Sequence, residues 1–155
     1  MMNTKLGFLL LIFMLTGGGL ARGQRQHNPK DQIQSLNWDI IGNIEFRMTE
    51  DDKIFPIYNS TVKRFANQSF TLEGYMVPLK NGFKHSSFLL STLPINQCYF
   101  CGQNGIPIMI LVEMQESVRF RFKPVRLRGI LKLENKNAAE EPPIILKGAK
   151  IMDED

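Results

Sequence analysis

The chain has 155 residues and a formal net charge of +4, and its length suits one domain with a single modest hydrophobic core. Two of its basic residues, Lys5 and Arg22, lie in an N-terminal segment that we expect to be removed, which leaves 17 basic against 15 acidic residues. A net charge of about +2 is too small to indicate a nucleic-acid partner.

The first 23 residues have the layout of a secretory signal peptide. Lys5 precedes an apolar run from Leu6 to Leu15, and small residues follow, with Ala21 and Gly23 placed for cleavage after Gly23. The run is shorter than the roughly 20 residues that span a bilayer, although an uncleaved N-terminal anchor is the alternative. No later apolar run reaches membrane length, so we expect an exported protein, periplasmic or envelope-associated, without a transmembrane segment after cleavage.

Residues 24–35 are polar and are expected to form a flexible lead-in. "WDIIGNIEF", residues 38–46, has the apolar content of a strand that is interrupted by Gly42. The following charged stretch, residues 47–68, carries enough apolar side chains to predict an ordered but irregular connection rather than a linker.

From residue 69 the pattern becomes strongly β. "SFTLEGYMVPL" alternates and places Phe70, Leu72 and Met76 on one side, with Gly74 as a bulge or tight bend. The pair Asn81-Gly82 predicts a hairpin turn into a return strand at residues 86–92.

Three further strands are expected after the cysteine loop. Residues 108–114 are aliphatic, residues 118–134 alternate strictly around Pro124 with Gly129 as a second glycine within a strand, and residues 144–152 form the last strand. Residues 135–143 have the composition of a polar loop, and residues 153–155 form an acidic tail.

Five or six strands bent by internal glycines, within about 100 residues, indicate a mainly β fold. We predict one domain over residues 36–152, a small OB-like, partly closed β-barrel. A β-sandwich is the alternative.

Several blocks in this order resemble a group of small exported Bacteroidota proteins related to the DUF3299 family. They are "WDIIGNIEF", "LEGYMVPL", "FLLSTLPINQCYFCG" and "LRGILKL" followed by "IILKGAKI", and they cover about residues 36–152. The family's cysteine motif continues with glycine, alanine, glycine, proline and an acidic residue, and this chain keeps the glycines and the proline but lacks the acid. The resemblance implies an envelope protein and, by analogy, a link to metal homeostasis.

The only two cysteines, Cys98 and Cys101, lie in "INQCYFCGQNG". In an exported protein the oxidising compartment favours a disulfide, which would close a four-residue loop and stabilise the fold by about 2 kcal/mol. A thiol-disulfide oxidoreductase is a further alternative. It is disfavoured because Gly102, Gly105 and Pro107 oppose the helix that lowers a catalytic cysteine pKa.

Metal binding is the second interpretation of the same motif. Two thiolates at this spacing can hold zinc or copper(I), but a closed site needs further ligands. Of the two histidines, His27 lies in the lead-in and His85 follows the Asn81-Gly82 turn. The candidate metal set is therefore Cys98, Cys101 and His85, completed by water or Glu113, whereas the simpler expectation for His85 is an exposed hairpin histidine.

One charge pattern stands out in the strands near the C-terminus. Basic residues there could bind phosphate, an acidic glycan or lipid headgroups, or could instead keep an exposed strand face soluble and block edge pairing. The alternation places Phe120 and Phe122 opposite the arginines, so we expect both in the core. The candidate anion-binding stripe comprises Arg119, Arg121, Lys123, Arg126 and Arg128.

No catalytic constellation can be assembled from the sequence. It lacks a phosphate loop, a dinucleotide fingerprint and a His-Glu-x-x-His motif, and two histidines are too few to argue a Ser-His-Asp triad. We therefore expect a non-enzymatic binding or accessory module with a disulfide-stapled loop, no cofactor, and an envelope protein or small ligand as partner. Metal handling is the first alternative.

Overall fold

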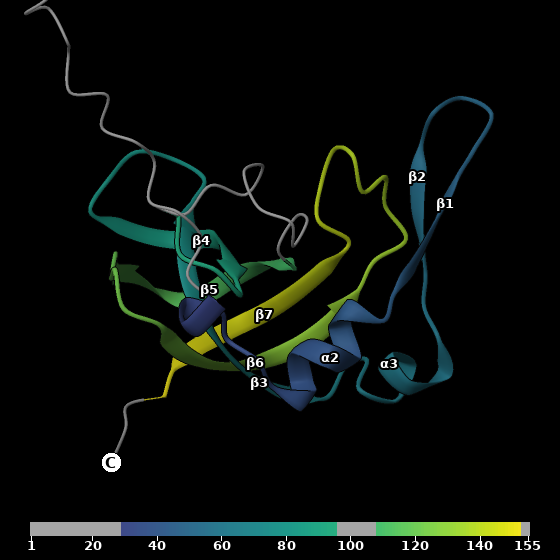
Figure 1. Cartoon of the computed structure of the whole chain (residues 1–155). Helices are drawn as coiled ribbons and strands as arrows, with labels where there is room; N and C mark the ends of the chain where they lie inside the picture. The colour runs from purple at the N-terminus through teal and green to yellow at the C-terminus, as the bar shows by residue number, and fades with distance from the viewer. Residues whose placement is uncertain (1–28, 96–107, 153–155) are drawn as a thin grey trace, which may run out of the picture.

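The computed structural model describes residues 29–95 and 108–152 (Figure 1). The predicted signal peptide, both cysteines and the acidic tail lie outside these residues. The elements in chain order are η1 (Pro29–Asp31), α2 (Leu36–Gly42), β1 (Glu45–Met48), β2 (Ile54–Ile57), α3 (Ser60–Arg64), β3 (Ser69–Pro78), β4 (Lys84–Ser91), β5 (Met109–Arg119), β6 (Val125–Leu133) and β7 (Ile144–Ile151). No helix within the described ranges is long and apolar enough to cross a membrane.

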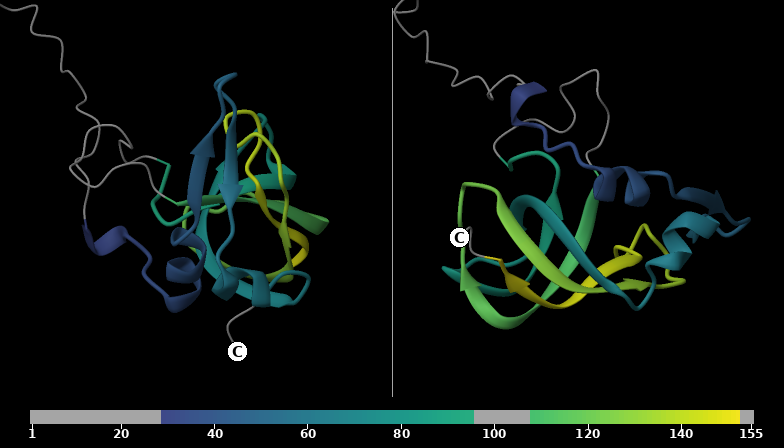
Figure 2. Two further views of the ribbon diagram at one scale, coloured as in Figure 1. Left: turned by 90° about the vertical axis from the view of Figure 1, so that its right-hand side faces the viewer. Right: turned by 90° about the horizontal axis from the view of Figure 1, so that it is seen from below.

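The five longer strands form a closed barrel in the order β3-β4-β5-β7-β6 (Figure 2). The pairing of β3 with β6 closes the ring, and β5 with β7 is the one parallel pair in the barrel. This order is that of an OB-like barrel, so the predicted fold class is confirmed. The short β1–β2 hairpin forms a separate two-stranded sheet beside the barrel.

Gly74 lies where β3 changes its partner. Residues 69–74 of β3 pair with β6, and residues 75–78 pair with β4. A Cβ atom at Gly74 would lie 2.6 Å from Leu90 Cγ and 2.9 Å from the Ser91 carbonyl oxygen. The strand can turn this corner only because the side chain is absent, as the sequence predicts.

Gly129 occupies the second predicted irregularity. The register between β6 and β7 shifts between Arg128 and Ile130, and a Cβ atom at Gly129 would lie 2.9 Å from the Lys147 carbonyl oxygen. The bulge therefore brings two backbones close together and tightens the curvature of the barrel.

The barrel core follows the predicted alternation. The inward-facing residues of β3 are buried, and the same is true of Val125, Leu127 and Leu131 on β6, whereas Arg126 and Arg128 between them are exposed. The remaining interior side chains are almost fully buried as well, and they include Phe88, Leu90, Ile110, Val112 and Leu146. A period of two, clearest on β3 and β6, sorts the apolar residues to the inside.

Residues 38–46 form a helix followed by a short strand, so the expectation of a strand at residue 38 was wrong. Ser35 caps α2 by accepting a hydrogen bond from the Trp38 N–H, and Trp38 and Ile41 face the core together. Their spacing of three residues suits one face of a helix, and it outweighs the strand propensity of the isoleucines.

The two helices cap one end of the barrel, which we call the helix-capped end. The Trp38 Nε1–H donates to the Glu73 carbonyl oxygen at 2.7 Å, and Trp38 is 1% exposed. On α3, Val62 is fully buried, and Phe65 just after the helix packs edge-on against Phe70 at 5.4 Å between ring centroids. The segment predicted as irregular, residues 47–68, contains the end of β1, all of β2 and all of α3.

Residues 29–35 have a defined place although the sequence predicts a flexible lead-in. They begin with the 3-10 turn η1, the Ile33 N–H donates to the Thr92 carbonyl oxygen at 3.0 Å, and Ile33 packs against the core. Ile33 is the single large apolar residue in this polar stretch, and it supplies the anchor.

Candidate anion-binding surface

The end of the barrel away from the helices is built from two neighbouring segments, residues 79–84 and residues 119–126, which we call the basic rim. The first is the β3–β4 turn and the second connects β5 to β6. The Phe120 N–H donates to the Phe83 carbonyl oxygen at 3.1 Å, and Lys84 lies opposite Arg119 in the β4–β5 register. Hydrogen bonds thus hold the two segments side by side.

The basic rim carries charge of one sign. Neither segment contains Asp or Glu, and the cationic residues are Lys80, Lys84, Arg119, Arg121, Lys123 and Arg126. All six side chains are exposed. Like charges directly opposite each other on neighbouring strands, as at Lys84 and Arg119, destabilise a sheet, and a bound anion would offset that repulsion.

A pocket of about 390 Å³ lies against the second segment and gathers three residues of the predicted stripe. Arg121, Lys123 and Arg126 line it, together with Glu73. Glu73 accepts from the Arg126 guanidinium at 3.0 Å, an exposed ion pair of small energetic value. Within the described residues no carboxylate pairs with Arg121 or Lys123, so this pocket presents net positive charge.

The remaining two residues of the stripe flank this pocket in different directions. Arg128 continues along the outside of β6, where its Nε donates to Thr71 Oγ1 at 3.3 Å and it lies opposite Lys150 of β7. Arg119 ends β5 beside Lys84. The predicted stripe is therefore not one straight row, because the chain leaves the sheet between Arg119 and Val125.

The basic rim also exposes aromatic side chains that the sequence did not assign to a surface. Phe83 is 91% exposed and Phe122 is 81% exposed, whereas Phe120 packs partly against the core. The expectation that Phe122 lies in the core was therefore wrong. Alternation fails as a guide here because β5 ends at Arg119 and residues 120–124 form a turn.

His85 is another correction, since it is 5% exposed rather than an exposed hairpin residue. A shift of register between His85 and Ser87 changes the alternation of β4 and buries the imidazole. The ring lies edge-on to Phe120 at 6.4 Å between centroids, and its Nε2 has no hydrogen-bond partner among the described residues. A buried nitrogen without a partner is rare and calls for an explanation.

The predicted metal set is not assembled by the part of the chain that the structure describes. Residues 29–95 and 108–152 contain no group of three or more His, Cys, Asp and Glu side chains placed to hold a metal ion. Cys98 and Cys101 lie outside these ranges, so the disulfide, metal and thiol-exchange interpretations all stay predictions. Glu113, proposed as a completing ligand, lies 3.9 Å from the Lys147 ammonium.

A smaller hollow of about 250 Å³ adjoins the basic rim. Tyr75, Phe120 and Phe122 supply its aromatic lining, and Arg121 and Asp31 its charged lining. Burial, followed by the nearby charges of Asp31 and Glu73, raises the pKa of Tyr75 above its ordinary value. Its hydroxyl can donate a hydrogen bond at neutral pH, and the raised pKa extends this to more alkaline pH.

The helix-capped end has a different kind of pocket, of about 480 Å³. It lies between α2, the β1–β2 hairpin and the β6–β7 loop, and its lining is apolar throughout, including Ile41, Phe46, Ile54 and Ile144. Such a lining offers no side chain that would orient a polar or charged ligand.

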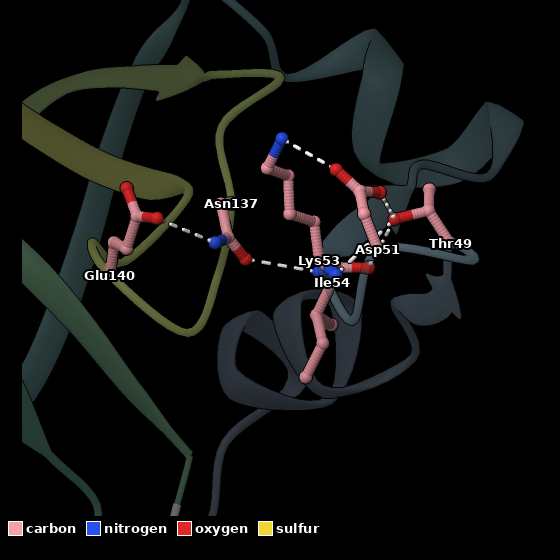
Figure 3. Close-up of polar contacts among 6 residues, drawn as sticks. All are labelled: Thr49, Asp51, Lys53, Ile54, Asn137 and Glu140. Carbon is pink, nitrogen blue, oxygen red and sulfur yellow. Dashed lines mark hydrogen bonds and ion pairs between the residues drawn. The ribbon is translucent and has the colours of Figure 1, made fainter.

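Polar contacts hold the walls of this apolar pocket together (Figure 3). The Ile54 N–H donates to Asn137 Oδ1 at 3.0 Å, and the Asn137 amide donates to Glu140 at 2.9 Å. Within the β1–β2 turn, Asp51 accepts from the Thr49 hydroxyl at 2.6 Å and pairs with Lys53 at 2.6 Å. These two contacts hold the pKa of the Asp51 carboxyl below its usual value, with Lys53 as the larger cause.

No protein-family model matches the chain, and no curated protein and no solved structure is significantly similar to it.

Proposed function

We propose that this protein is a non-enzymatic binding module of the bacterial envelope that holds anionic groups on its basic rim. The observation that carries the proposal is the pocket in which Arg121, Lys123 and Arg126 converge opposite a single carboxylate, that of Glu73. Arginine presents a planar fork of donors that matches phosphate and carboxylate oxygens, and lysine adds a mobile point charge.

The surroundings of the pocket favour binding over catalysis. Its side chains are three cations, one carboxylate already engaged by Arg126, and apolar groups. The one histidine among the described residues, His85, lies buried behind Phe120 and does not line the pocket. A nucleophile paired with a base, which acyl or phosphoryl transfer would need, has no counterpart in this pocket.

The test is calorimetric titration of the full chain with inorganic polyphosphate at low and at high salt. We expect binding that weakens steeply as salt rises, because the attraction is between exposed charges. Replacing Arg121→Gln and Lys123→Gln together should weaken the affinity at least about tenfold, since two charge-assisted contacts are lost.

The matched control replaces Lys63→Gln and Arg64→Gln, two exposed cations of α3 at the helix-capped end. This variant has the same net charge as the rim variant and should bind like the unchanged chain. Equal losses in both variants would mean that only overall charge matters and would refute a defined site.

The place in the envelope is part of the proposal and rests on the sequence. The signal-peptide layout of residues 1–23 supports export, and the resemblance to exported Bacteroidota proteins related to the DUF3299 family supports an envelope location. Detection of a chain that begins at Gln24 in the periplasm would agree with both.

A second candidate function is metal handling by Cys98 and Cys101, and one described residue favours it. The His85 Nε2 is buried without a hydrogen-bond partner among the described residues, as expected for a nitrogen reserved for a ligand. Pro94 and Ile95, which lead into the cysteine loop, line the same hollow as Phe120, and Phe120 contacts His85. The path of the chain thus brings the residues before the loop towards this histidine.

Native mass spectrometry of the exported protein separates the interpretations of the cysteines. One bound zinc or copper(I) that is lost on His85→Ala would support metal handling. The control is His85→Phe, which keeps a buried ring but has no nitrogen, and it should lose the metal as well. A mass lower by two hydrogens, without a metal, would support the structural disulfide and remove the metal interpretation. Exchange with a reduced dithiol would support the oxidoreductase instead.

A further inference from the structure

We propose that the basic rim docks on an anionic lipid membrane, with Phe83 and Phe122 inserted among the headgroups. This inference rests on the proposed function, because it names the anionic partner as a lipid surface. The proposal adds a second kind of contact, an aromatic one, that a soluble anion does not need. The two claims can therefore fail separately.

The aromatic side chains stand at the tips of both rim segments. Phe83 ends the β3–β4 turn and Phe122 lies in the middle of the β5–β6 turn, and both are more than four-fifths exposed. Phe122 packs edge-on against Phe120 at 4.8 Å between centroids, and the Phe120 N–H bonds to the Phe83 carbonyl oxygen. Phe120 thus links the two tips, through its ring to Phe122 and through its backbone to Phe83, and the half-exposed Leu79 adds a third apolar side chain at this end; we call these exposed side chains the apolar projection.

Cations surround this apolar projection in the chain. Lys84 follows Phe83, Arg121 and Lys123 precede and follow Phe122, and Lys80 follows Leu79. Phenylalanine, like Trp and Leu, is found on apolar faces buried at the boundary between headgroups and acyl chains, and neighbouring lysines and arginines are attracted to anionic lipids at the surface. The alternation of the two residue types along both turns fits this interface.

The shape of the surface favours a membrane over a soluble ligand as the partner of the aromatic residues. Phe83 lines neither the pocket of about 390 Å³ nor the hollow of about 250 Å³, and at 91% exposure its ring projects into solvent, whereas Phe122 forms part of the rim of that hollow. Protruding rings would leave most of their surface in water against a small anion but would bury it in a bilayer.

Within residues 29–95 and 108–152, the helices and the β1–β2 hairpin lie away from this end. In Figure 1 the β3–β4 turn and the β5–β6 turn lie on one side of the molecule, and α3 with the β1–β2 hairpin lies on the other. Docking through the basic rim would therefore direct the apolar pocket and the helices away from the lipid. Trp38, the only tryptophan, is buried at the helix-capped end and would not touch the membrane.

The first experiment is flotation of the full chain with two kinds of vesicle, one of phosphatidylcholine alone and one with about 30% phosphatidylglycerol. We expect at least about tenfold tighter binding to the anionic vesicles, and most of the difference should vanish at about 1 M salt, where charge is screened within a few ångströms. The apolar run at residues 6–15 is common to every variant, so differences between variants report the rim.

The paired variant Phe83→Ser with Phe122→Ser should lower binding to anionic vesicles at least about tenfold, because buried apolar area is lost. Its control, Leu36→Ser with Met48→Ser, removes two apolar side chains that are also more than half exposed but lie at the helix-capped end. That control should bind like the unchanged chain. Both paired variants should retain the circular dichroism spectrum of the unchanged protein.

A local probe makes the insertion visible. In the variant Phe122→Trp the introduced indole should shift its emission to the blue and be quenched by brominated lipid when anionic vesicles are added. Trp38 is 1% exposed, so it provides a constant background.

Three outcomes would overturn the membrane proposal. They are equal binding to neutral and anionic vesicles, anionic binding that does not depend on Phe83 and Phe122, and an emission of the Phe122→Trp variant that stays unchanged while the protein binds. If polyphosphate binding survives alongside any of them, the proposed function stands and the anion is a soluble one. If polyphosphate binding fails while the vesicle results hold, the lipid surface itself is the ligand and the pocket at Arg121 is not a separate site.

Discussion

The two ends of the barrel differ in how far their aromatic side chains are exposed: Phe46 is 52% exposed at the helix-capped end, whereas Phe83 and Phe122 at the basic rim are 91% and 81% exposed. At the helix-capped end Trp38 is buried under α2, and Phe65 packs against Phe70. At the basic rim Phe83 and Phe122 stand in solvent among cations, and the buried His85 lacks a partner for its Nε2 within the described residues. Both ends expose apolar side chains, including Leu36 and Met48 at the helix-capped end, but only the rim combines them with unpaired cations and a buried imidazole nitrogen that lacks a partner among the described residues.

The basic rim contains features that do not favour the stability of the fold. Opposed like charges at Lys84 and Arg119 and an unsatisfied buried nitrogen at His85 lower the stability of an isolated domain, and the exposed phenylalanines add almost nothing to it. Departures from foldability that gather in one region are expected at functional sites. We therefore expect substitutions at the helix-capped end to change the free energy of unfolding strongly, and substitutions of the exposed rim side chains to change it little.

The largest effect is expected from Trp38→Ala. The change empties a fully buried site and leaves the Glu73 carbonyl oxygen without the indole N–H, so the free energy of unfolding should fall by about 3 to 5 kcal/mol. Urea denaturation followed by circular dichroism measures it. Leu36→Ala, an exposed position on the same helix, is the control and should change little.

A smaller loss is expected at the barrel corner from Gly74→Ala. The new methyl group would meet Leu90 and the Ser91 carbonyl oxygen, and we expect a loss of about 1 to 3 kcal/mol. Ser69→Ala, on an exposed position of the same strand, controls for the change in propensity. A neutral Gly74→Ala would show that β3 does not need its close approach to β4.

Tyr58→Phe tests the support of the β6–β7 loop beside the helices. The Tyr58 hydroxyl lies 2.7 Å from the Glu134 carbonyl oxygen and 2.9 Å from that of Pro143, so its loss should cost about 1 to 2 kcal/mol. Thermal unfolding at neutral pH measures the loss.

The same hydroxyl predicts a pH dependence at alkaline pH. Burial raises the pKa of Tyr58 to about 12, above its ordinary value near 10. The folded state thus holds this proton more tightly, so the stabilisation is complete below about pH 10 and is lost as the pH rises towards 12. Between about pH 8 and about pH 11 the unchanged protein should lose more stability than Tyr58→Phe. Parallel losses would contradict the assignment.

The smallest effect on stability is expected at the basic rim. Phe83→Ser with Phe122→Ser removes exposed side chains, so the free energy of unfolding should change by no more than about 0.5 kcal/mol. Urea denaturation of this paired variant and of Trp38→Ala, under the same conditions, compares the two losses of unfolding free energy. A loss above about 2 kcal/mol would make these rings structural and remove the contrast between the two ends.

The sequence predicts the barrel well because β-strands repeat with a period of two. The inward row of β3, the hairpin at Asn81-Gly82, the corner at Gly74 and the bulge at Gly129 all follow from local pattern and are confirmed. Residues 38–42 form a helix although their two isoleucines favour a strand, because the Ser35 cap and the three-residue spacing of the buried side chains outweigh that propensity.

The candidate site was only partly predictable, because the period of two is interrupted near it. The cations of the stripe can be identified from the residue letters, and Arg126 and Arg128 face outward as alternation requires. The predictions for Phe122 and His85 are wrong because a turn and a bulge interrupt the alternation at those points. Pro124 marks the first interruption in the sequence, whereas the bulge between His85 and Ser87 has no such signal. Phe83 could have been noticed as an aromatic residue directly after the Asn81-Gly82 turn.

The most direct test of the account is a chemical-shift map of backbone amides in the full chain with anionic and with neutral bicelles. With anionic bicelles we expect the largest chemical-shift changes at residues 79–84 and 119–126, and unchanged shifts in α3 and the β1–β2 hairpin. Changes confined to the helix-capped end, or an equal response to neutral bicelles, would contradict it.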